Sequence, residues 1–324
     1  MLGLVPGIPM RASYRSKRHG RDKPGHDTIK ALAMTFDLFL LQLFTGLALG
    51  SIFVLVALGI SLIFGLLTIV NFAHGQFFML GAYVGAFALG MTGNFWLSLL
   101  AVPLFVGAVG MLSERFLVRP LYGRGIDYPL LLTYGLGLII LDAVRIVAGT
   151  EGLPFPTPEI LTGAADLGFF FFPTYRLFLI LVTAVLLVAL WLFLERTSYG
   201  LVIRAGARDP EIVQILGVDI GRVWLIVFAI GVALAGLAGV LAAPIRGVFP
   251  EMGVPVLVEA FVVTVVGGMG SLLGAVIAGL LVGITVSFTS FYFPEMATLS
   301  MFLLMALVLI FRPRGLFGRA GLME

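Results

Sequence analysis

The sequence contains no cysteine, and its few lysines all lie near the N-terminus. Without cysteine the chain can form no disulfide, thiolate zinc site, iron–sulfur cluster or cysteine nucleophile. The lysines are Lys17, Lys23 and Lys30, so no phosphate-binding loop of the type G-x-x-x-x-G-K-[ST] can lie in the hydrophobic part of the chain. ATP hydrolysis by such a loop is therefore excluded, and no cofactor is expected in this chain.

Histidine is almost as scarce, since His74 is the one histidine after the first 26 residues. A single histidine excludes the H-E-x-x-H motif and any multi-histidine metal site, so no metal is expected. The serines of the hydrophobic segments, among them Ser61, Ser271 and Ser287, lie outside any G-x-S-x-G motif. An intramembrane enzyme is therefore disfavoured, and no catalytic residue is assigned.

Charged residues make up 11% of the chain, against about 25% in an average soluble domain. Hydrophobic residues make up 60%, and long apolar segments recur from about residue 38 to residue 311. These features predict an all-α polytopic integral membrane protein in contact with lipid. The 41 glycines predict closely packed helices, because small residues let helix backbones approach each other within a bilayer.

The net charge of +3 comes from the N-terminal tail, because residues 1–33 hold seven Lys or Arg against two Asp. The remainder is slightly acidic, so no nucleic-acid partner is expected. The tail is polar and lacks the apolar core of a signal peptide, which predicts a disordered basic segment. Alternatively, translation starts at Met34 and residues 1–33 are not made.

A length of about 20 apolar residues per crossing gives seven clear spans, near residues 72–90, 95–117, 128–149, 176–194, 223–243, 271–290 and 297–311. Two further segments are awkward. Residues 37–70 are long for one straight span and short for two, and residues 256–268 form a short apolar piece that ends in "GGMGS". We therefore expect a bundle of about 8–10 transmembrane helices over residues 34–318, with short broken or re-entrant helices.

Arginines mark one side of this bundle. They flank residues 115–124, recur in the loop 195–222, and return at Arg312, Arg314 and the C-terminal tail 319–324, whereas the opposite loops contain almost none. By the positive-inside rule, the arginine-rich loops and the C-terminus are cytoplasmic. Counting residues 37–70 once gives nine crossings and an external N-terminus; counting them twice gives ten and an internal one.

Polar side chains interrupt the apolar run "IVNFAHGQFFMLGAYVGAF" at Asn71, His74 and Gln76. Such groups are costly in a bilayer and face the bundle interior or a cavity. In one reading Asn71 caps a helix that starts here and His74 bonds to an adjacent helix. In the other, these side chains contact a substrate or a gate.

Further candidates for a pathway lie around the second awkward segment. Glu259 begins this short piece, where it either meets a substrate that enters from outside or is a carboxylate at the membrane interface, and Gly268 and Gly270 end the piece. Both awkward segments combine an apolar stretch, a break and a glycine-spaced helix, which is compatible with an internal repeat or with two ordinary packing helices. Asp142 and Arg145 share one helical face and are expected to form a local ion pair.

The longest arginine-rich loop contains its own helix signals. Asp209 is a good N-cap, Pro210 suits the first helical position, and Gly217 suits the left-handed stop. Between them lies an apolar helix of under two turns, which predicts either a partner surface or a helix folded back on the membrane interface.

Three stretches together resemble one known family: "NFAHGQFFMLGAY" at 71–83, "RTSYGLVIRAGARDPEIVQILGVD" at 196–219, and "FVVTVVGGMGSLLGAVIAGLLVG" at 261–283. They are similar to the LivH-type permeases of branched-chain amino-acid ABC importers, and the resemblance covers about residues 36–318. It implies a membrane-spanning transport subunit of the bacterial inner membrane and not an enzyme. Its implied partners are a second, related permease, two cytoplasmic ATP-binding subunits that use ATP, and a periplasmic substrate-binding protein.

By the same resemblance, the loop 195–222 is the element that couples to an ATPase. The candidate coupling residues are Arg204, Asp209, Glu211, Ile212, Val213, Leu216 and Gly217. Relatives usually show alanines where this chain has Ile212 and Val213, a departure that puts the transfer of individual roles in doubt. The candidate pathway residues are Asn71, His74, Gln76, Glu259, Gly268 and Gly270.

Three alternative functions remain open. Similar permeases carry urea, short amides or other amino acids. A stand-alone channel or secondary transporter is a second alternative, and it predicts coupling carboxylates deep in the spans. An intramembrane enzyme is the third, and it lacks an obvious nucleophile or metal set.

Overall fold

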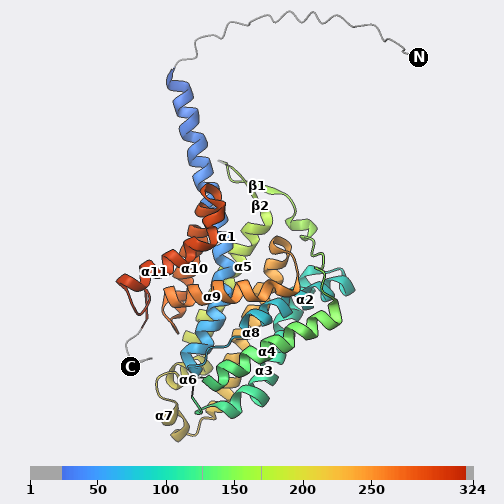
Figure 1. Cartoon of the computed structure of the whole chain (residues 1–324), viewed down its shortest axis with the longest axis vertical. Coiled ribbons are helices and arrows are strands. Elements are labelled where there is room, and N and C mark those ends of the chain that lie inside the picture. Colours follow the sequence, from blue (N-terminus) through green and yellow to red (C-terminus); the bar gives the residue numbers. More distant parts are fainter. Residues whose placement is uncertain (1–23, 126, 169, 319–324) are drawn as a thin grey trace, which may run out of the picture. The chain divides into compact units, whose positions relative to one another are not determined.

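The computed structural model describes residues 24–125, 127–168 and 170–318. By its internal contacts the chain divides into residues 1–39 and residues 40–324, and the packing described below lies within the second unit. Figure 1 shows the elements, most of which are helices. The long helices are α1 (Pro24–Leu67), α2 (His74–Thr92), α3 (Phe95–Ser113), α4 (Asp127–Ala148), α5 (Thr174–Arg196), α8 (Ile220–Arg246), α9 (Gly253–Gly267), α10 (Leu272–Tyr292) and α11 (Ala297–Phe311).

Short elements connect these helices. They are η1 (Glu114–Val118), η2 (Arg119–Leu121), η3 (Glu159–Leu161), α6 (Ser198–Gly206), α7 (Pro210–Ile215), η4 (Pro250–Met252), η5 (Pro294–Met296), and the antiparallel strands β1 (Ala164–Asp166) and β2 (Phe171–Pro173). In the described part of the chain, nine helical segments are long and apolar enough to cross a bilayer. The expected all-α polytopic membrane fold is confirmed.

Helix α1 resolves the first awkward segment, because it runs without interruption to Leu67. Nine candidate spans result, and the alternative of two short crossings between residues 37 and 70 is wrong. Of the predicted tail, residues 1–23 lie outside the described residues, and residues 24–33 are the first turns of α1. The C-terminal tail 319–324 also lies outside them.

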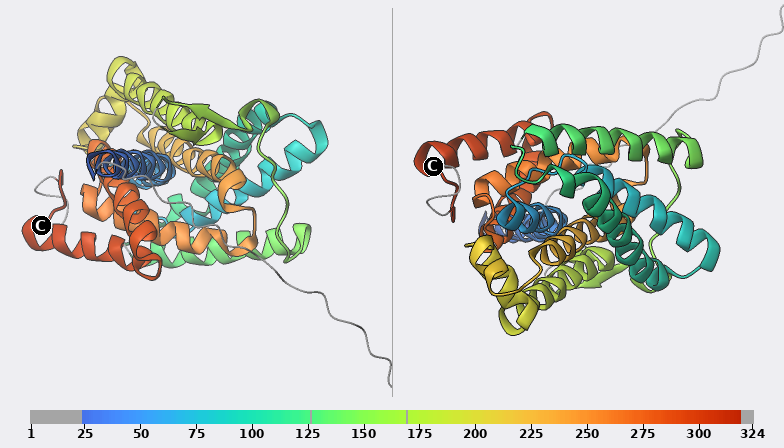
Figure 2. Two further views of the ribbon diagram at one scale, coloured as in Figure 1. Left: turned by 90° about the horizontal axis from the view of Figure 1, so that it is seen from above. Right: turned by 90° about the horizontal axis from the view of Figure 1, so that it is seen from below.

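Helix α1 is the most buried span: 89% of its most apolar window is buried inside the protein. Figure 2 looks along α1, with α8, α9 and α10 around it. Its middle contributes Phe53, Val54, Ala57 and Leu58 to a core shared with α9 and α10. An apolar helix that is buried all round needs no amphipathic stripe, which explains why its sequence shows none.

Glycines set the closest helix contacts. Gly46 and Gly50 of α1 lie against Gly279 and Gly283 of α10, where added Cβ atoms would come within about 3 Å of the opposite backbone. The four-residue spacing on both helices puts each glycine pair on one face, as in the small-xxx-small contacts of membrane helices. Ser287 adds a hydrogen bond to the carbonyl oxygen of Gln42, at 2.9 Å.

Helix α8 forms a second centre, against which α2 and α3 pack. Gly81 of α2 meets Gly236, and Gly239 lies directly on the Phe78 backbone. On the other side, Val106 of α3 covers Gly236. The resulting core contains the fully buried aromatic side chains of Phe77, Phe78 and Phe228.

Helix α9 and the turn after it account for the second awkward segment. With η4, α9 makes an 18-residue candidate span, longer than the piece 256–268 identified in the sequence. Gly268 and Gly270 have φ angles of 98° and 78° and form the turn into α10. The segment after α11 packs onto this turn, where the Leu316 and Phe317 amides donate to the Val266 and Gly267 carbonyl oxygens.

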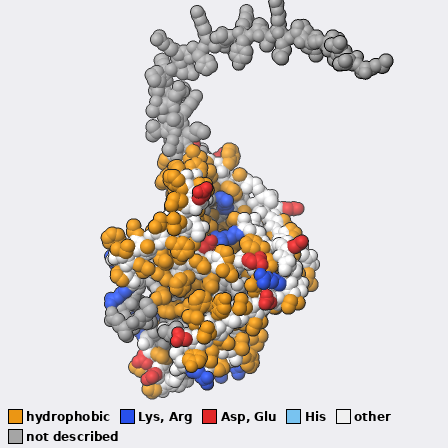
Figure 3. All heavy atoms as spheres, viewed as in Figure 1, with side chains coloured by type: hydrophobic (Ala, Val, Ile, Leu, Met, Phe, Trp, Pro, Cys, Tyr) orange, Lys and Arg blue, Asp and Glu red, His pale blue; other side chains and the backbone are white. Residues whose placement is uncertain are grey.

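The outer helices carry the apolar surface. In α5 and α11 only 17% of the most apolar window is buried, against 72% in α8. Figure 3 shows one face on which hydrophobic side chains form a broad surface with few charged side chains between them. Such a surface is suited to lipid or to another apolar helix, in agreement with the predicted membrane location.

Candidate functional site

The segment between α1 and α2 positions the predicted polar cluster. After Leu67 the chain leaves the helix at Thr68, which has a φ angle of 54°, and α2 begins at His74. The Asn71 side-chain oxygen accepts from the Ala73 amide at 3.0 Å, and the Phe72 amide donates to the Thr133 hydroxyl of α4 at 3.1 Å. Asn71 thus supports the turn before α2, although the cap position itself is Ala73 and has no side-chain bond.

His74 is fully buried against α1. Its Nε2 lies 3.0 Å from the Val56 carbonyl oxygen, and because a carbonyl only accepts, Nε2 is the protonated nitrogen in this bond. The ring also fills the space above Gly59, where a Cβ would lie 2.8 Å from Cε1. The expected bond to an adjacent helix is present, and contact with a substrate stays a prediction.

Gln76 and Tyr83 leave polar atoms without partners. The Gln76 Oε1 and the Tyr83 hydroxyl are buried and have no hydrogen-bond partner among the described residues. They lie seven positions apart on α2, so they share one helical face. Gln76 packs against Gly253 at the start of α9 and against Gly137 of α4. The Asn71 Nδ2 and the His74 Nδ1 are also buried without a partner among the described residues. Unsatisfied buried polar atoms are costly, so the segment from Asn71 to Tyr83 as a whole is a candidate for contact with a polar cargo or water.

Glu259 forms a largely buried ion pair and does not stand open at an interface. Its carboxylate accepts from Arg246 at 2.9 Å, and the two side chains are 19% and 22% exposed. The guanidinium also lies 5.6 Å from the centre of the Phe53 ring. The pair therefore joins the end of α8 to α9 beside α1.

A second ion-pair group is more exposed. Arg145 donates to Asp142 at 3.3 Å, as the helical spacing predicted, and also to Glu251 at 2.8 Å. Glu251 belongs to η4, which precedes α9. This group ties α4 to the chain that leads into α9.

The predicted pathway residues do not form one cluster. Gly253, next to Gln76, lies at one end of α9, whereas Gly268 follows the other end, about 21 Å away along the helix axis. Gly268 packs against Gly315 and Gly318, and Gly270 against Gly65 near the end of α1. The two glycines thus serve a tight turn, where their positive φ angles favour glycine.

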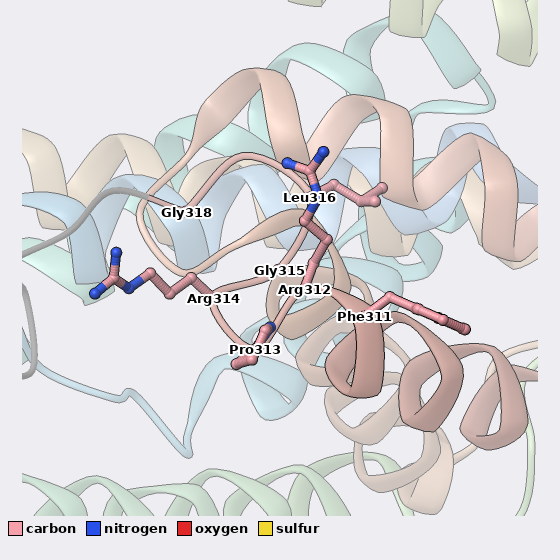
Figure 4. Close-up of a pocket in the computed structure, with 7 residues that line it drawn as sticks. All are labelled: Phe311, Arg312, Pro313, Arg314, Gly315, Leu316 and Gly318. Atoms are coloured by element: carbon pink, nitrogen blue, oxygen red, sulfur yellow. The ribbon is translucent and has the colours of Figure 1, made fainter.

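A hollow of about 530 Å³ lies beside this turn. It is lined by Phe311, Arg312, Pro313, Arg314, Gly315, Leu316 and Gly318, which are neighbours in the chain. The Arg312 and Arg314 side chains point away from each other (Figure 4), so they do not converge on a ligand. Across residues 24–125, 127–168 and 170–318, no group of three or more His, Cys, Asp or Glu side chains could hold a metal.

The predicted coupling loop is two short helices. The α7 helix starts at Pro210, its N-cap Asp209 accepts from the Ile212 amide at 3.0 Å, and Gly217 has a φ angle of 82°. These three local predictions are confirmed. Arg204 of α6 pairs with Glu195 at 2.9 Å and donates to the Leu194 carbonyl oxygen, which fixes α6 to the end of α5.

The apolar residues of this loop divide into two sets. Val213 is 5% exposed and packs with Ile203 and Ile220 in a small core that also contains Leu62 and Leu66 of α1. In contrast, the outward side chains are at least half exposed: Tyr199, Leu201, Ile212, Ile215 and Leu216. We call these five residues the loop patch. Val213 therefore supports the loop from within, and Ile212 and Leu216 belong to its surface.

Sequence analysis missed a buried cluster around Glu114, a carboxylate at the end of α3 that is 0% exposed. It accepts two hydrogen bonds from Arg119 and one from the Tyr122 hydroxyl. Burial and the Glu114 carboxylate raise the pKa of Tyr122, so its hydroxyl stays protonated and donates. The available signal was a lone glutamate directly after an apolar run, with an arginine five positions later.

The chain matches the family described as the permease component of branched-chain amino acid transport systems over residues 42–311. The chain belongs to this family. No solved structure matches it.

Curated members of this permease family are similar over most of their length. The chain is 33% identical to the high-affinity branched-chain amino acid transport system permease protein LivH of Escherichia coli K12, over 88% of this chain and 97% of LivH. It is 31% identical to the corresponding protein BraD of Pseudomonas aeruginosa, over 87% of this chain and 96% of BraD.

A second type of permease also matches. The chain is 30% identical to LivM of Escherichia coli K12, over 82% of this chain and 67% of LivM. Two related permeases therefore occur in this family. As a family member with nine candidate spans, the chain is a multi-pass membrane protein of a multi-component transport system.

Proposed function

We propose that this chain is one of two permease subunits of an ATP-driven importer for branched-chain or closely related amino acids. The observation that supports it most is the membership in the permease family, which covers residues 42–311. The relatives LivH and BraD are named for branched-chain amino acid transport. Urea, short amides and other amino acids are the alternative cargoes.

The ATP-binding subunits would dock on the loop patch. Its exposed apolar side chains stand on two capped helices, and α6 is fixed to α5 by the Arg204–Glu195 pair. A rigid apolar surface outside the bundle is a typical partner site. ATP hydrolysis takes place on those separate chains, and a periplasmic binding protein delivers the cargo.

The arginine distribution supports an orientation in the bacterial inner membrane. With nine crossings, a cytoplasmic C-terminus puts the N-terminus outside. In this orientation the loop patch faces the cytoplasm, as an ATP-driven importer requires.

Purification of the C-terminally tagged chain from mild-detergent membranes, followed by mass spectrometry, tests this proposal. We expect two P-loop ATPases and a second permease to co-purify. The variant Ile215→Glu should lose the ATPases and keep the second permease, because it puts a charge into the loop patch. Ile160→Glu is the matched control, since Ile160 is 78% exposed in a loop predicted to lie on the opposite side. A wild-type chain that purifies without any ATPase would favour a channel or secondary transporter.

A further inference from the structure

The Glu114 cluster fastens α3 to the first turn of α8. Arg119 holds the Glu114 carboxylate through Nε at 3.1 Å and Nη2 at 2.8 Å, and the same Nη2 donates to the Gly221 carbonyl oxygen at 2.7 Å. The Tyr122 hydroxyl donates to Glu114 at 3.0 Å. Its ring meets the Trp224 ring edge-on, with 4.7 Å between the ring centres. We call Glu114, Arg119 and Tyr122 the α3 clasp.

The backbone at the clasp is shaped to make this contact. Residues 114–118 form the π-helix η1 between α3 and the 3₁₀ turn η2. Such interruptions are frequent at functional sites, and here the widened turn carries Glu114. Gly221 allows close approach, because a Cβ there would lie 3.3 Å from the Arg119 Nη1.

The same turn of α8 also contacts the coupling loop. Ile220 and Val223 pack in one core with Ile203 of α6 and Val213 of α7. At Gly206, an added Cβ would lie 2.7 Å from the Ile220 side chain. Asp219 caps α8 by accepting from the Arg222 amide at 3.2 Å. The first turn of α8 is thus held by α6 and α7 through one core and by the α3 clasp through Arg119.

A buried ion pair is weak support for a purely stabilising role. Desolvation offsets much of its Coulomb energy, and apolar replacements of similar volume are often neutral or stabilising. What the α3 clasp adds is a bidentate, directional link. Farther along, α3 packs on α8 through Val106 on Gly236 and Gly110 on Val232. Held by the α3 clasp and by these contacts along its C-terminal half, α3 follows a displacement of α8.

We infer that the α3 clasp transmits movement of the coupling loop to α3 through the first turn of α8, so its three residues are positioning residues of the transport cycle. This inference rests on the proposed function. Without the clasp, the loop still moves α8, but the Glu114 end of α3 follows only through packing contacts such as Gly110 on Val232. ATP hydrolysis then continues with less cargo moved per ATP.

The test uses the whole complex in lipid nanodiscs and proteoliposomes, and measures assembly, ATP hydrolysis and leucine uptake. The double variant Glu114→Met with Arg119→Met removes both charges, so no unpaired buried charge is left. We expect it to assemble, to hydrolyse ATP within about twofold of wild type, and to import at least fivefold less leucine per ATP. Arg119→Lys keeps the positive charge but cannot form the bidentate pair with a carboxylate. Its ratio of leucine imported to ATP hydrolysed should lie between those of wild type and the double variant.

Two further variants separate transmission from general damage. Tyr122→Phe retains the ring on Trp224 and loses only the hydrogen bond to Glu114, so its ratio of leucine imported to ATP hydrolysed should lie between those of wild type and the double variant. Arg115→Gln is the matched control, because Arg115 is exposed beside Glu114, and its ratio should equal that of wild type.

Each outcome decides the inference. A wild-type ratio in the double variant overturns it, as does failure of both the double variant and Arg119→Lys to assemble, which would assign the cluster to folding. A wild-type complex that shows no ATP-driven uptake contradicts the proposed function itself, and the inference falls with it.

Discussion

At Gly59, where α1 meets α2, the structure leaves no room for a side chain. A Cβ on Gly59 would lie 2.4 Å from the Gly231 carbonyl oxygen and 2.8 Å from the His74 ring. We expect Gly59→Ala to destabilise the protein by about 1–3 kcal/mol, as overpacking does in other cores. Thermal unfolding in detergent measures this effect.

Gly90 offers the matched control for this change. It lies in the same helix as His74, and nothing comes within 4 Å of a Cβ built on it. Gly90→Ala should leave stability unchanged or raise it by about 0.5–1 kcal/mol. Unchanged or increased stability in both variants would show that helix propensity, and not the space beside His74, decides the effect at Gly59.

The Glu259–Arg246 pair makes a second prediction for single residues. Either Glu259→Met or Arg246→Met leaves a largely buried charge without its partner, and should cost about 3 kcal/mol. The double variant should cost less than either single variant. A double-mutant cycle by thermal unfolding checks this, and additive losses would argue against an energetic coupling of the two charges.

At the level of elements, the α7 helix depends on its two ends. Asp209→Ala removes the N-cap, worth about 1 kcal/mol, and Gly217→Pro cannot adopt the φ angle of 82°. We expect both variants to insert normally and to lose substrate-stimulated ATPase activity. Asp209→Asn and Gly217→Asn are the controls, because asparagine suits both an N-cap and a left-handed residue. Normal stimulation in the first two variants, with intact complexes, would contradict a coupling role.

The elements also show what the sequence could predict. The limits of α7 were predicted correctly because Asp209, Pro210 and Gly217 act on their own neighbours. The extent of α1 was harder to predict. A continuous apolar run of this length contains no turn signal that distinguishes one long helix from two short ones. The Glu114–Arg119 pair has a local signal, but its link to α8 could not be predicted, because Gly221 lies 102 positions from Arg119 and no local pattern reports such a contact. The six pathway candidates were polar or glycine positions, and their separate locations depend on how α2, α4 and α9 pack.

The natural lack of cysteine makes the orientation of the whole molecule measurable. A single cysteine can be introduced at Ile215 or at Ile160, which are both more than three-quarters exposed. In intact cells that lack the ATP-binding subunits, a membrane-impermeant maleimide should label Ile160→Cys at once, and Ile215→Cys only after permeabilisation. Val213→Cys is the control for access, because Val213 is 5% exposed and should label poorly in both conditions. Reversed labelling would invert the proposed orientation.

The contacts of α2 with its neighbouring helices form at different times during synthesis on the ribosome. The acceptor of His74 is Val56, which has already been synthesised, whereas the glycines that receive α2 on α8 are Gly236 and Gly239. At about 5–20 residues per second, synthesis of these glycines follows that of α2 by roughly 8–30 s, during which α2 can pack only on the helix that precedes it. Chains that end at residue 219 should therefore be degraded by membrane proteases faster than chains that include α8. Before α8 is made, the face of α2 that later packs on α8 is uncovered, and protein quality control can recognise it.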